Sequence, residues 1–183
     1  MTEEAGEHSI AELILRDHEV IRDLIDRFDS APTGDWVEVF SDLVQYVVRH
    51  ELAEEEVVLP VVRRLSEKGD RIADECLLEQ ARAQARLEEM GRLSPASVEF
   101  RDELGHLKDD ISNHAAQEQQ AVIPLLEDQS AAEGRDLARR YELARMAAPA
   151  SPRLLGEDPP ADGVHTGRIA AVAERVRAAI RDR

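Results

Sequence analysis

The chain has 183 residues and a formal net charge of −16, with 39 acidic residues against 23 basic ones. This length fits one ordinary domain with room for an appendage, and so much negative charge argues against a nucleic acid or an anionic membrane as the partner. Aromatic residues make up only 3% of the chain, while Ala, Leu, Val, Glu and Arg are abundant, a composition typical of helices.

The sequence contains no segment that predicts passage into or across a membrane. No apolar run approaches the ~18 residues of a membrane span, and the polar, acidic N-terminus lacks the pattern of a signal peptide. The single cysteine, Cys76, excludes an internal disulfide bond, so a reducing compartment is expected. We therefore predict a soluble, cytoplasmic and mostly helical protein.

Apolar residues recur at spacings of three and four along most of the chain, which predicts helices rather than strands. The first expected helix covers about residues 9–28, and its apolar stripe includes His18. The turn at residues 31–34 should end this helix, and either Thr33 or Asp35 can cap the next one.

The second and third expected helices each carry a polar residue inside an apolar face. The second has one continuous apolar face whose middle is polar, at His50 and Glu54, and Gly69 is expected to end it. The third is expected at about residues 70–93, with Gln80 at the level of those polar groups.

The fourth expected helix follows Ser94 and Pro95, which suit an N-cap and a first helical position. Its apolar stripe is interrupted by His114 and Glu118. Four helices of about 20 to 30 residues with short loops predict an all-α fold, an antiparallel up-down-up-down four-helix bundle.

We expect the bundle to occupy residues 1–130 and a helical extension to occupy residues 131–183. Within the extension, residues 131–147 form a helical stretch, residues 148–165 a proline-rich linker and residues 167–182 a terminal amphipathic helix. This last helix is basic by count on an acidic protein. Docking across the bundle or onto a second subunit would satisfy its apolar stripe and its charge.

Two segments of the expected bundle repeat one another. In each, a histidine is followed four residues later by a glutamate and ten residues later by a proline: His50, Glu54 and Pro60, then His114, Glu118 and Pro124. Residues four apart lie on one face of a helix, so each pair aims an imidazole and a carboxylate at a common point. The prolines should kink or weaken a helical turn in both halves.

These groups predict a metal site in the bundle core. Two ionised glutamates there would repel one another and lose hydration, at a cost of several kcal/mol per ion, and neither repeat supplies an inward Lys or Arg. A divalent or trivalent cation would neutralise them, and imidazoles with carboxylates but no thiolate suit iron, manganese or zinc. Two carboxylates able to bridge, with at least three nitrogens, favour two ions over one. His8 and Glu12 share the spacing but lie off the apolar stripe, so we expect them on a solvated face. The candidate ligands are His18, His50, Glu54, His114 and Glu118.

Taken in order, these residues resemble a known family. The resemblance, over about residues 9–127, is to hemerythrin-like proteins of the HHE cation-binding type, and the tail is similar to the extensions of actinobacterial members. It is carried by His18, the His50 and Glu54 pair with Pro60, a Glu-Gln pair at 79–80, and the His114 and Glu118 pair with Pro124.

The resemblance implies a non-haem di-iron centre inside a four-helix bundle. The three histidines would be terminal nitrogen ligands, and Glu54 and Glu118 would bridge the two ions. An oxo or hydroxo group would complete the bridge, and one position would stay open for dioxygen, peroxide or nitric oxide.

Gln80 departs from the family pattern, which usually has a histidine at this place, and we keep it among the candidate metal ligands. Its amide oxygen is a weaker donor than imidazole, so three outcomes stay open: two irons with an altered potential, one ion, or a centre filled by water. Gln84, Tyr46 and Glu51 are substitute ligand candidates. The alternative for Tyr46 is a packing residue whose hydroxyl lies on a neighbouring carboxylate.

The leading functional prediction is a cytoplasmic non-haem iron protein that binds or responds to dioxygen, peroxide or nitric oxide. One alternative is an iron-dependent enzyme that disproportionates peroxide or oxidises iron. The other is a bundle with a degenerate single-metal or empty site and a structural or partner-binding role. The sequence supplies no dedicated acid–base pair beyond the ligands, so catalysis and binding stay unseparated.

Overall fold

The computed structural model describes residues 8–148. The predicted terminal helix, and all but the first residue of the predicted linker, lie outside the described residues. The helices are α1 (Ile10–Ser30), α2 (Trp36–Ala53), α3 (Leu59–Leu65), α4 (Gly69–Met90), α5 (Val98–Ala121), α6 (Ile123–Glu127) and α7 (Ala131–Ala147). A 3₁₀ turn, η1 (Thr33–Asp35), precedes α2, and a π-helical turn, η2 (Glu54–Val58), joins α2 to α3.

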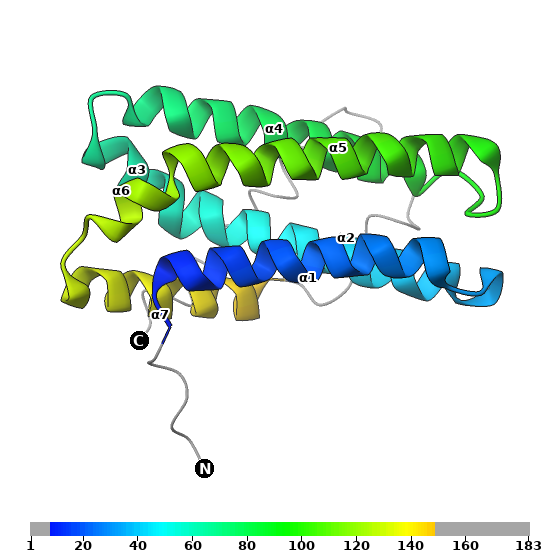
Figure 1. The fold of residues 1–183 in the computed structure, drawn as a ribbon, viewed down its shortest axis with the longest axis horizontal. Helices are drawn as coiled ribbons and strands as arrows, with labels where there is room; N and C mark the ends of the chain where they lie inside the picture. The colour runs from blue at the N-terminus through cyan, green and yellow to red at the C-terminus, as the bar shows by residue number, and fades with distance from the viewer. Residues whose placement is uncertain (1–7, 149–183) are drawn as a thin grey trace, which may run out of the picture.

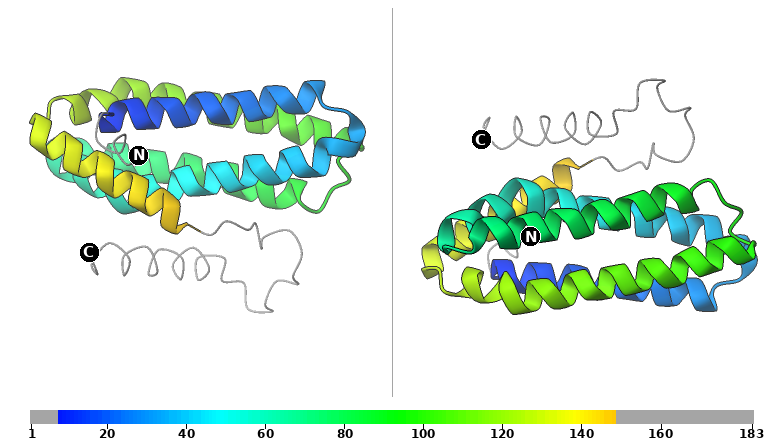
Figure 2. Two further views of the ribbon diagram at one scale, coloured as in Figure 1. Left: turned by 90° about the horizontal axis from the view of Figure 1, so that it is seen from below. Right: turned by 90° about the horizontal axis from the view of Figure 1, so that it is seen from above.

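The long helices α1, α2, α4 and α5 lie side by side along the molecule as an antiparallel four-helix bundle (Figure 1). The predicted all-α, up-down-up-down architecture is confirmed. The helix predicted at residues 131–147 is present as α7, and it packs against α1, α2 and η2 (Figure 2). The boundary that we placed at residue 130, between bundle and extension, stays a prediction.

The bundle core consists of two apolar clusters with a polar layer between them. One cluster contains Ile14 and Val57, and the other contains Ile21 and Val47. His18 lies between Ile14 and Ile21 along α1, and the other long helices also place a buried polar residue between the two clusters. The apolar stripes of the helices therefore hold the polar layer at one depth.

Both prolines of the repeated segments lie where a long helix is deformed. Pro60 has no N–H to give to the carbonyl of residue 56, and the turn before it is π-helical, with the Leu59 N–H donating to the Glu54 carbonyl. In the second half, α5 ends at Ala121 and α6 begins after Val122, with Pro124 in its first turn. The predicted deformation in both halves is confirmed.

Two predicted helix ends are wrong: the start of the fourth long helix at Ser94 and Pro95, and the end of a helix at Gly69. Ser94 and Pro95 do not start α5, because the Ser94 carbonyl accepts a hydrogen bond from the Ser97 N–H at 2.9 Å and closes a turn with proline at its second position. Ser97 is the N-cap, and its hydroxyl accepts from the Phe100 N–H at 3.1 Å. At α2, Asp35 occupies the N-cap position but makes no side-chain capping hydrogen bond.

Gly69 begins α4 instead of ending the preceding helix, and it is buried against α3. A Cβ atom built on it would contact the Val62 carbonyl oxygen and lie 2.9 Å from both the Cα and the carbonyl oxygen of Arg63. The absence of a side chain at this position therefore lets the start of α4 approach the backbone of α3.

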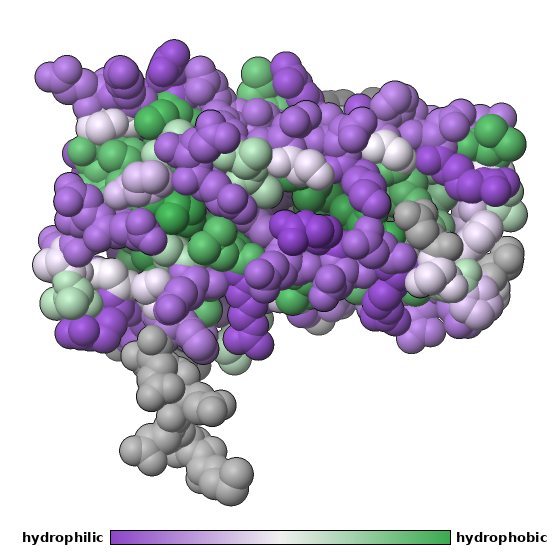
Figure 3. All heavy atoms as spheres, in the orientation of Figure 1, coloured by the Kyte–Doolittle hydropathy of each residue, from purple (hydrophilic) through white to green (hydrophobic). Residues whose placement is uncertain are grey.

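The outer faces of the helices are largely hydrophilic on the side shown in Figure 3, with hydrophobic side chains between them. Among the described residues, no helix combines the length and the apolar character needed to cross a bilayer. The amphipathic pattern read from the sequence therefore describes a bundle with its apolar stripes turned inward.

We predict that Gly69→Ala lowers the free energy of unfolding by about 1 to 3 kcal/mol, because the added methyl group meets backbone atoms that have no rotamer to adopt. The matched control is Gly105→Ala within α5, where a Cβ meets nothing within 4 Å. That change should raise the free energy of unfolding by roughly 0.5 to 1 kcal/mol, the usual gain for alanine inside a helix. Denaturant unfolding of both variants checks this, and equal effects of the same sign would contradict the close approach at Gly69.

Candidate metal centre

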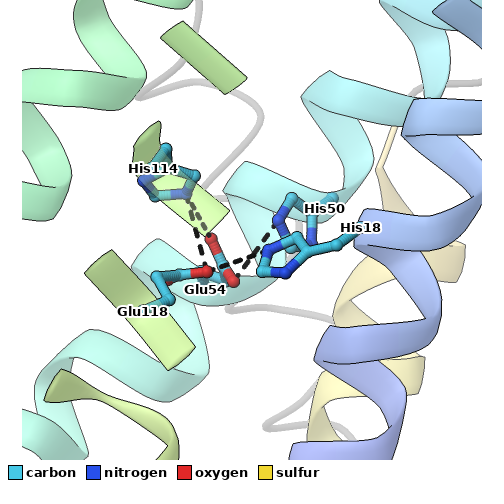
Figure 4. Close-up of side chains that lie close together, drawn as sticks. All are labelled: His18, His50, Glu54, His114 and Glu118. Atoms are coloured by element: carbon cyan, nitrogen blue, oxygen red, sulfur yellow. Dashed lines mark ion pairs between the residues drawn. The ribbon is translucent and has the colours of Figure 1, made fainter. Parts of the chain in front are cut away.

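Five buried side chains converge in the polar layer of the bundle (Figure 4). α1, α2 and η2 provide one each, and α5 provides two. Each side chain offers one nitrogen or carboxylate oxygen, and these five atoms all lie within 4.8 Å of one another. Their exposed fractions range from 0% to 8%. They are His18, His50, Glu54, His114 and Glu118.

Each imidazole in this cluster approaches a carboxylate through its Nε2 atom. His18 Nε2 lies 3.0 Å from Glu118 Oε2. His50 Nε2 lies 3.4 Å from Glu54 Oε1. His114 Nε2 lies 3.6 Å from one oxygen of each glutamate. The three histidines and two glutamates therefore face one common point.

Most of the facing atoms have no hydrogen-bond partner within the described part of the chain. The buried atoms without a partner include Nε2 of all three histidines, Oε1 of Glu54 and both carboxylate oxygens of Glu118. Buried polar atoms without partners are costly and uncommon in folded proteins. A cation at the common point would satisfy all of them together, so the residues present fit a metal ion.

The electrostatics of the cluster call for positive charge. Although burial acts in the opposite direction, Glu118 and Glu54 raise the pKa of His114 well above its usual range, and a bound cation would take the place of that proton. Burial and the nearby Glu118 charge raise the pKa of Glu54 well above its usual range. Burial lowers the pKa of His50, which favours the neutral imidazole, the form that binds metals. Within the described residues, the ion pairs of both glutamates are with histidines, and no Lys or Arg is paired with either.

The two glutamates occupy equivalent places just before the helix deformations. Glu54 is the first residue of the π-helical turn, and the Glu118 carbonyl accepts from the Val122 N–H at 2.9 Å at the end of α5. Each glutamate keeps the spacing of one helical turn to its histidine, so the pairs point inward together. Turns of the π type are frequent at functional sites.

Gln80, from α4, is 1% exposed and contacts the cluster through its amide nitrogen. Its Nε2 donates a hydrogen bond to Glu54 Oε2 at 2.9 Å, while its Oε1 is buried without a hydrogen-bond partner among the described residues. One turn later, Gln84 Nε2 donates to Glu51 Oε2 at 2.7 Å. Burial raises the pKa of Glu51 to about 8. Gln84 and Glu51 therefore pair with each other.

His8 and Glu12 lie on a solvated face, as predicted, and Tyr46 has the alternative role that we gave for it. His8 and Glu12 are exposed, with His8 Nδ1 3.8 Å from Glu12 Oε2. The Tyr46 hydroxyl donates to Asp17 Oδ1 at 3.1 Å, in agreement with the alternative in which it lies on a neighbouring carboxylate.

Comparison with known proteins gives the family. The sequence pattern of the hemerythrin HHE cation-binding domain matches residues 9–145, three quarters of the chain. This chain belongs to that family. In the crystal structure of a hemerythrin HHE cation-binding domain-containing protein from Mycobacterium kansasii the same fold is found, with a TM-score of 0.67 and 19% identity. That match covers 92% of this chain and 99% of the other.

A curated relative shares part of this HHE domain sequence. A DNA nickase from Nostoc sp. (strain PCC 7120 / SAG 25.82 / UTEX 2576) is 27% identical over 126 residues, which is 68% of this chain. The match spans only 35% of the nickase. The name therefore describes a protein about three times as long as the shared region.

Sequence reasoning missed the groups behind His50 in this HHE domain. His50 Nδ1 lies 2.8 Å from the Tyr141 hydroxyl, and that hydroxyl donates to Asp17 Oδ2 at 2.8 Å. Since the hydroxyl proton goes to Asp17, the hydroxyl oxygen accepts from an Nδ1–H of His50. The Nε2 atom, which faces the cluster, is then the unprotonated nitrogen and is free to bind a metal.

Asp17 connects this contact to α7 and to a positive charge. It is fully buried, and Arg145 Nη1 lies 3.1 Å from its Oδ1. Although burial acts in the opposite direction, contacts with His50, Arg145 and Tyr141 lower the pKa of Asp17. Neither repeat was expected to supply an inward Lys or Arg, and the basic residue near the cluster comes from α7 instead. Its Arg145 pairs with the carboxylate of Asp17, behind the cluster. The signal available in the sequence was that Asp17 directly precedes His18 on an amphipathic helix.

We predict that Tyr141→Phe weakens metal binding by about 10- to 100-fold, the usual effect of removing a group that orients a ligand histidine. It should also cost about 1 to 3 kcal/mol of stability, because His50 and Asp17 lose a buried partner. Equilibrium competition with a chelator and denaturant unfolding measure the two effects.

Tyr46→Phe is the matched control. The Tyr46 hydroxyl also donates to Asp17 but makes no hydrogen bond to a cluster histidine. Its loss should leave metal affinity nearly unchanged. Equal losses of affinity in the two variants would contradict the role that we give to Tyr141.

Proposed function

We propose that this HHE domain is a non-haem iron protein that binds or responds to dioxygen, peroxide or nitric oxide. The observation that carries the proposal is the set of buried, unpaired imidazole and carboxylate atoms that face one point within 4.8 Å of one another. Nitrogen and oxygen donors without thiolate suit iron, with manganese and zinc as the other ions of matching chemistry. His18, His50 and His114 would supply the nitrogens, and Glu54 and Glu118 the oxygens.

Iron held by such donors supplies an open coordination position and a change of oxidation state for a small ligand. The chain's own residues control what reaches that position. Ile14 and Leu107 are fully buried, Ile21 and Val47 are nearly so, and together they pack on the two sides of the polar layer. These side chains would exclude bulk water and admit only small ligands.

Behind the cluster, Asp17 and Tyr141 hold the imidazole of His50 in the tautomer that presents Nε2. Arg145 offsets the charge of Asp17, so that carboxylate does not compete with Glu54 and Glu118 for the cation. The nicking of DNA that names the Nostoc relative is not part of the proposal. A net charge of −16 would repel phosphate backbones.

We predict at least one iron per chain in protein purified from iron-supplied cells. His114→Ala should lose most of that iron, because the variant removes one of the three nitrogen ligands. It also removes an imidazole that contacts both glutamates, so their mutual repulsion is less compensated. The control is His106→Ala, on the exposed surface of α5, which should keep the iron content of the unchanged protein. Elemental analysis gives the metal content, and circular dichroism verifies that both variants are folded.

The reduced, iron-loaded protein should change its visible and near-ultraviolet absorption when it meets dioxygen, peroxide or nitric oxide, and His114→Ala should not. Less than one iron per chain, or one zinc in its place, would contradict the proposal. So would an absorption spectrum that none of the three ligands alters.

A further inference from the structure

We infer that the cluster holds a single metal ion bound by five protein donors, and that α4 supplies hydrogen-bond donors where a second ion would need ligands. The family resemblance implies two ions, so this is a departure specific to the chain. The inference rests on the proposed function for the identity of the metal. Its geometric part stands on the distances and hydrogen bonds of the described residues.

The spacing of the donor atoms fits one ion. With metal–ligand bonds of ~2.0–2.2 Å, two donors on one ion are at most about 4.4 Å apart. The five atoms here lie within 4.8 Å of one another, so small side-chain shifts would bring them all onto one ion. Two ions in a shared site are ~3.5–4 Å apart. Nitrogens on the outer sides of such a pair would be separated by roughly 6 Å or more. The ring centroids of His18 and His50 lie 6.3 and 6.4 Å from that of His114, but the donor nitrogens that the three rings present lie within 4.8 Å of one another, which is closer than such a pair requires.

The supply of nitrogen points the same way. Two ions that shared both glutamates would have three histidines between them, so one ion would hold a single imidazole. One ion instead takes His18, His50 and His114 with both glutamates, and an octahedral shell then keeps one open position. That position is where a small ligand would bind.

Two glutamines of α4 direct amide hydrogens at buried carboxylates, one in the cluster and one beside it. Gln80 gives an N–H to Glu54 Oε2 at 2.9 Å, and Gln84 gives one to Glu51 Oε2 at 2.7 Å. An oxygen that accepts from Gln80 is less available to a second cation, and an N–H group has no lone pair to offer one. Turning the Gln80 amide over would press its oxygen against the Glu54 carboxylate, which places two acceptors in contact.

Charge balance also favours one ion. A divalent ion with two carboxylates and three neutral imidazoles gives a buried group with no net charge. A second divalent ion would leave two positive charges between the apolar clusters. Of the other buried acids, Asp17 is already paired with Arg145, and Glu51 already accepts a hydrogen bond from Gln84. Uncompensated charge in such surroundings is costly.

The test is the number of ions that the full-length chain binds. The metal-free protein is titrated anaerobically with ferrous iron, and the metal that stays bound through gel filtration is counted. The sample is then oxidised, and its electron paramagnetic resonance spectrum is recorded. An isolated ferric ion gives a signal, whereas two oxo-bridged ferric ions couple and are silent. We expect one equivalent, with the signal of an isolated ion.

A gain of capacity provides the complementary measurement. The double variant Gln80→His and Gln84→His gives α4 two imidazoles at helical spacing, and its capacity should rise from one equivalent to two. The control variant carries Gln119→His and Gln120→His, both on the exposed surface of α5, and should still bind one ion tightly.

The outcomes separate this inference from the proposed function. Two equivalents of coupled iron in the unchanged protein would overturn the single-ion site and leave an iron protein. One equivalent of zinc or manganese, with no affinity for iron, would support the single-ion geometry and refute the iron assignment. A double variant that still binds one ion would overturn the role given to α4.

Discussion

The structure depends on the burial of two carboxylates beside each other, in contact with imidazoles and with one glutamine amide but with no Lys or Arg among the described residues. Glu54 and Glu118 lie in the core between two apolar clusters, and the ion pairs found for them among the described residues are with histidines. Without a cation, this layer combines charge repulsion with polar atoms that have lost water and gained no partner. With a cation, the same atoms become a complete set of ligands. The polar layer is therefore unfavourable for the fold alone and favourable for a fold that holds a metal.

The rest of the bundle serves to keep that layer in place. Apolar stripes on both sides fix its depth, and the deformations near Pro60 and Pro124 follow directly after the two glutamates. Helix α7 contributes as well, because Tyr141 and Arg145 reach Asp17 from outside the four long helices. An element that the sequence presents as an appendage thus supports the orientation of His50. Loss of α7 would remove Tyr141 from the imidazole of His50, and both Tyr141 and Arg145 from the carboxylate of Asp17.

The sequence was informative where a periodic pattern carried the signal. The repeated histidine and glutamate spacing located four side chains that the fold does bring together, and the apolar stripe of the first helix located the fifth, His18. The proline after each pair located the deformed turns. It was uninformative where the contact is made between distant segments. Asp17 and Tyr141 are 124 positions apart and meet only because α7 folds back on α1. The start of α5 was misplaced because Ser94 and Pro95 suit a turn as well as a helix cap. The pattern also pointed to Gln80, but it could not show that the amide nitrogen of this residue faces Glu54.

The most direct test is the stability of the full-length protein with and without bound metal. At a metal concentration 100-fold above the dissociation constant, binding should raise the free energy of unfolding by about 2.7 kcal/mol. In the double variant Glu54→Gln and Glu118→Gln that gain should vanish, while the metal-free form should be at least as stable as the unchanged protein, because the buried repulsion is gone. A metal-free protein as stable as the metal-loaded one, and more stable than the double variant, would show that the carboxylates are satisfied without a cation.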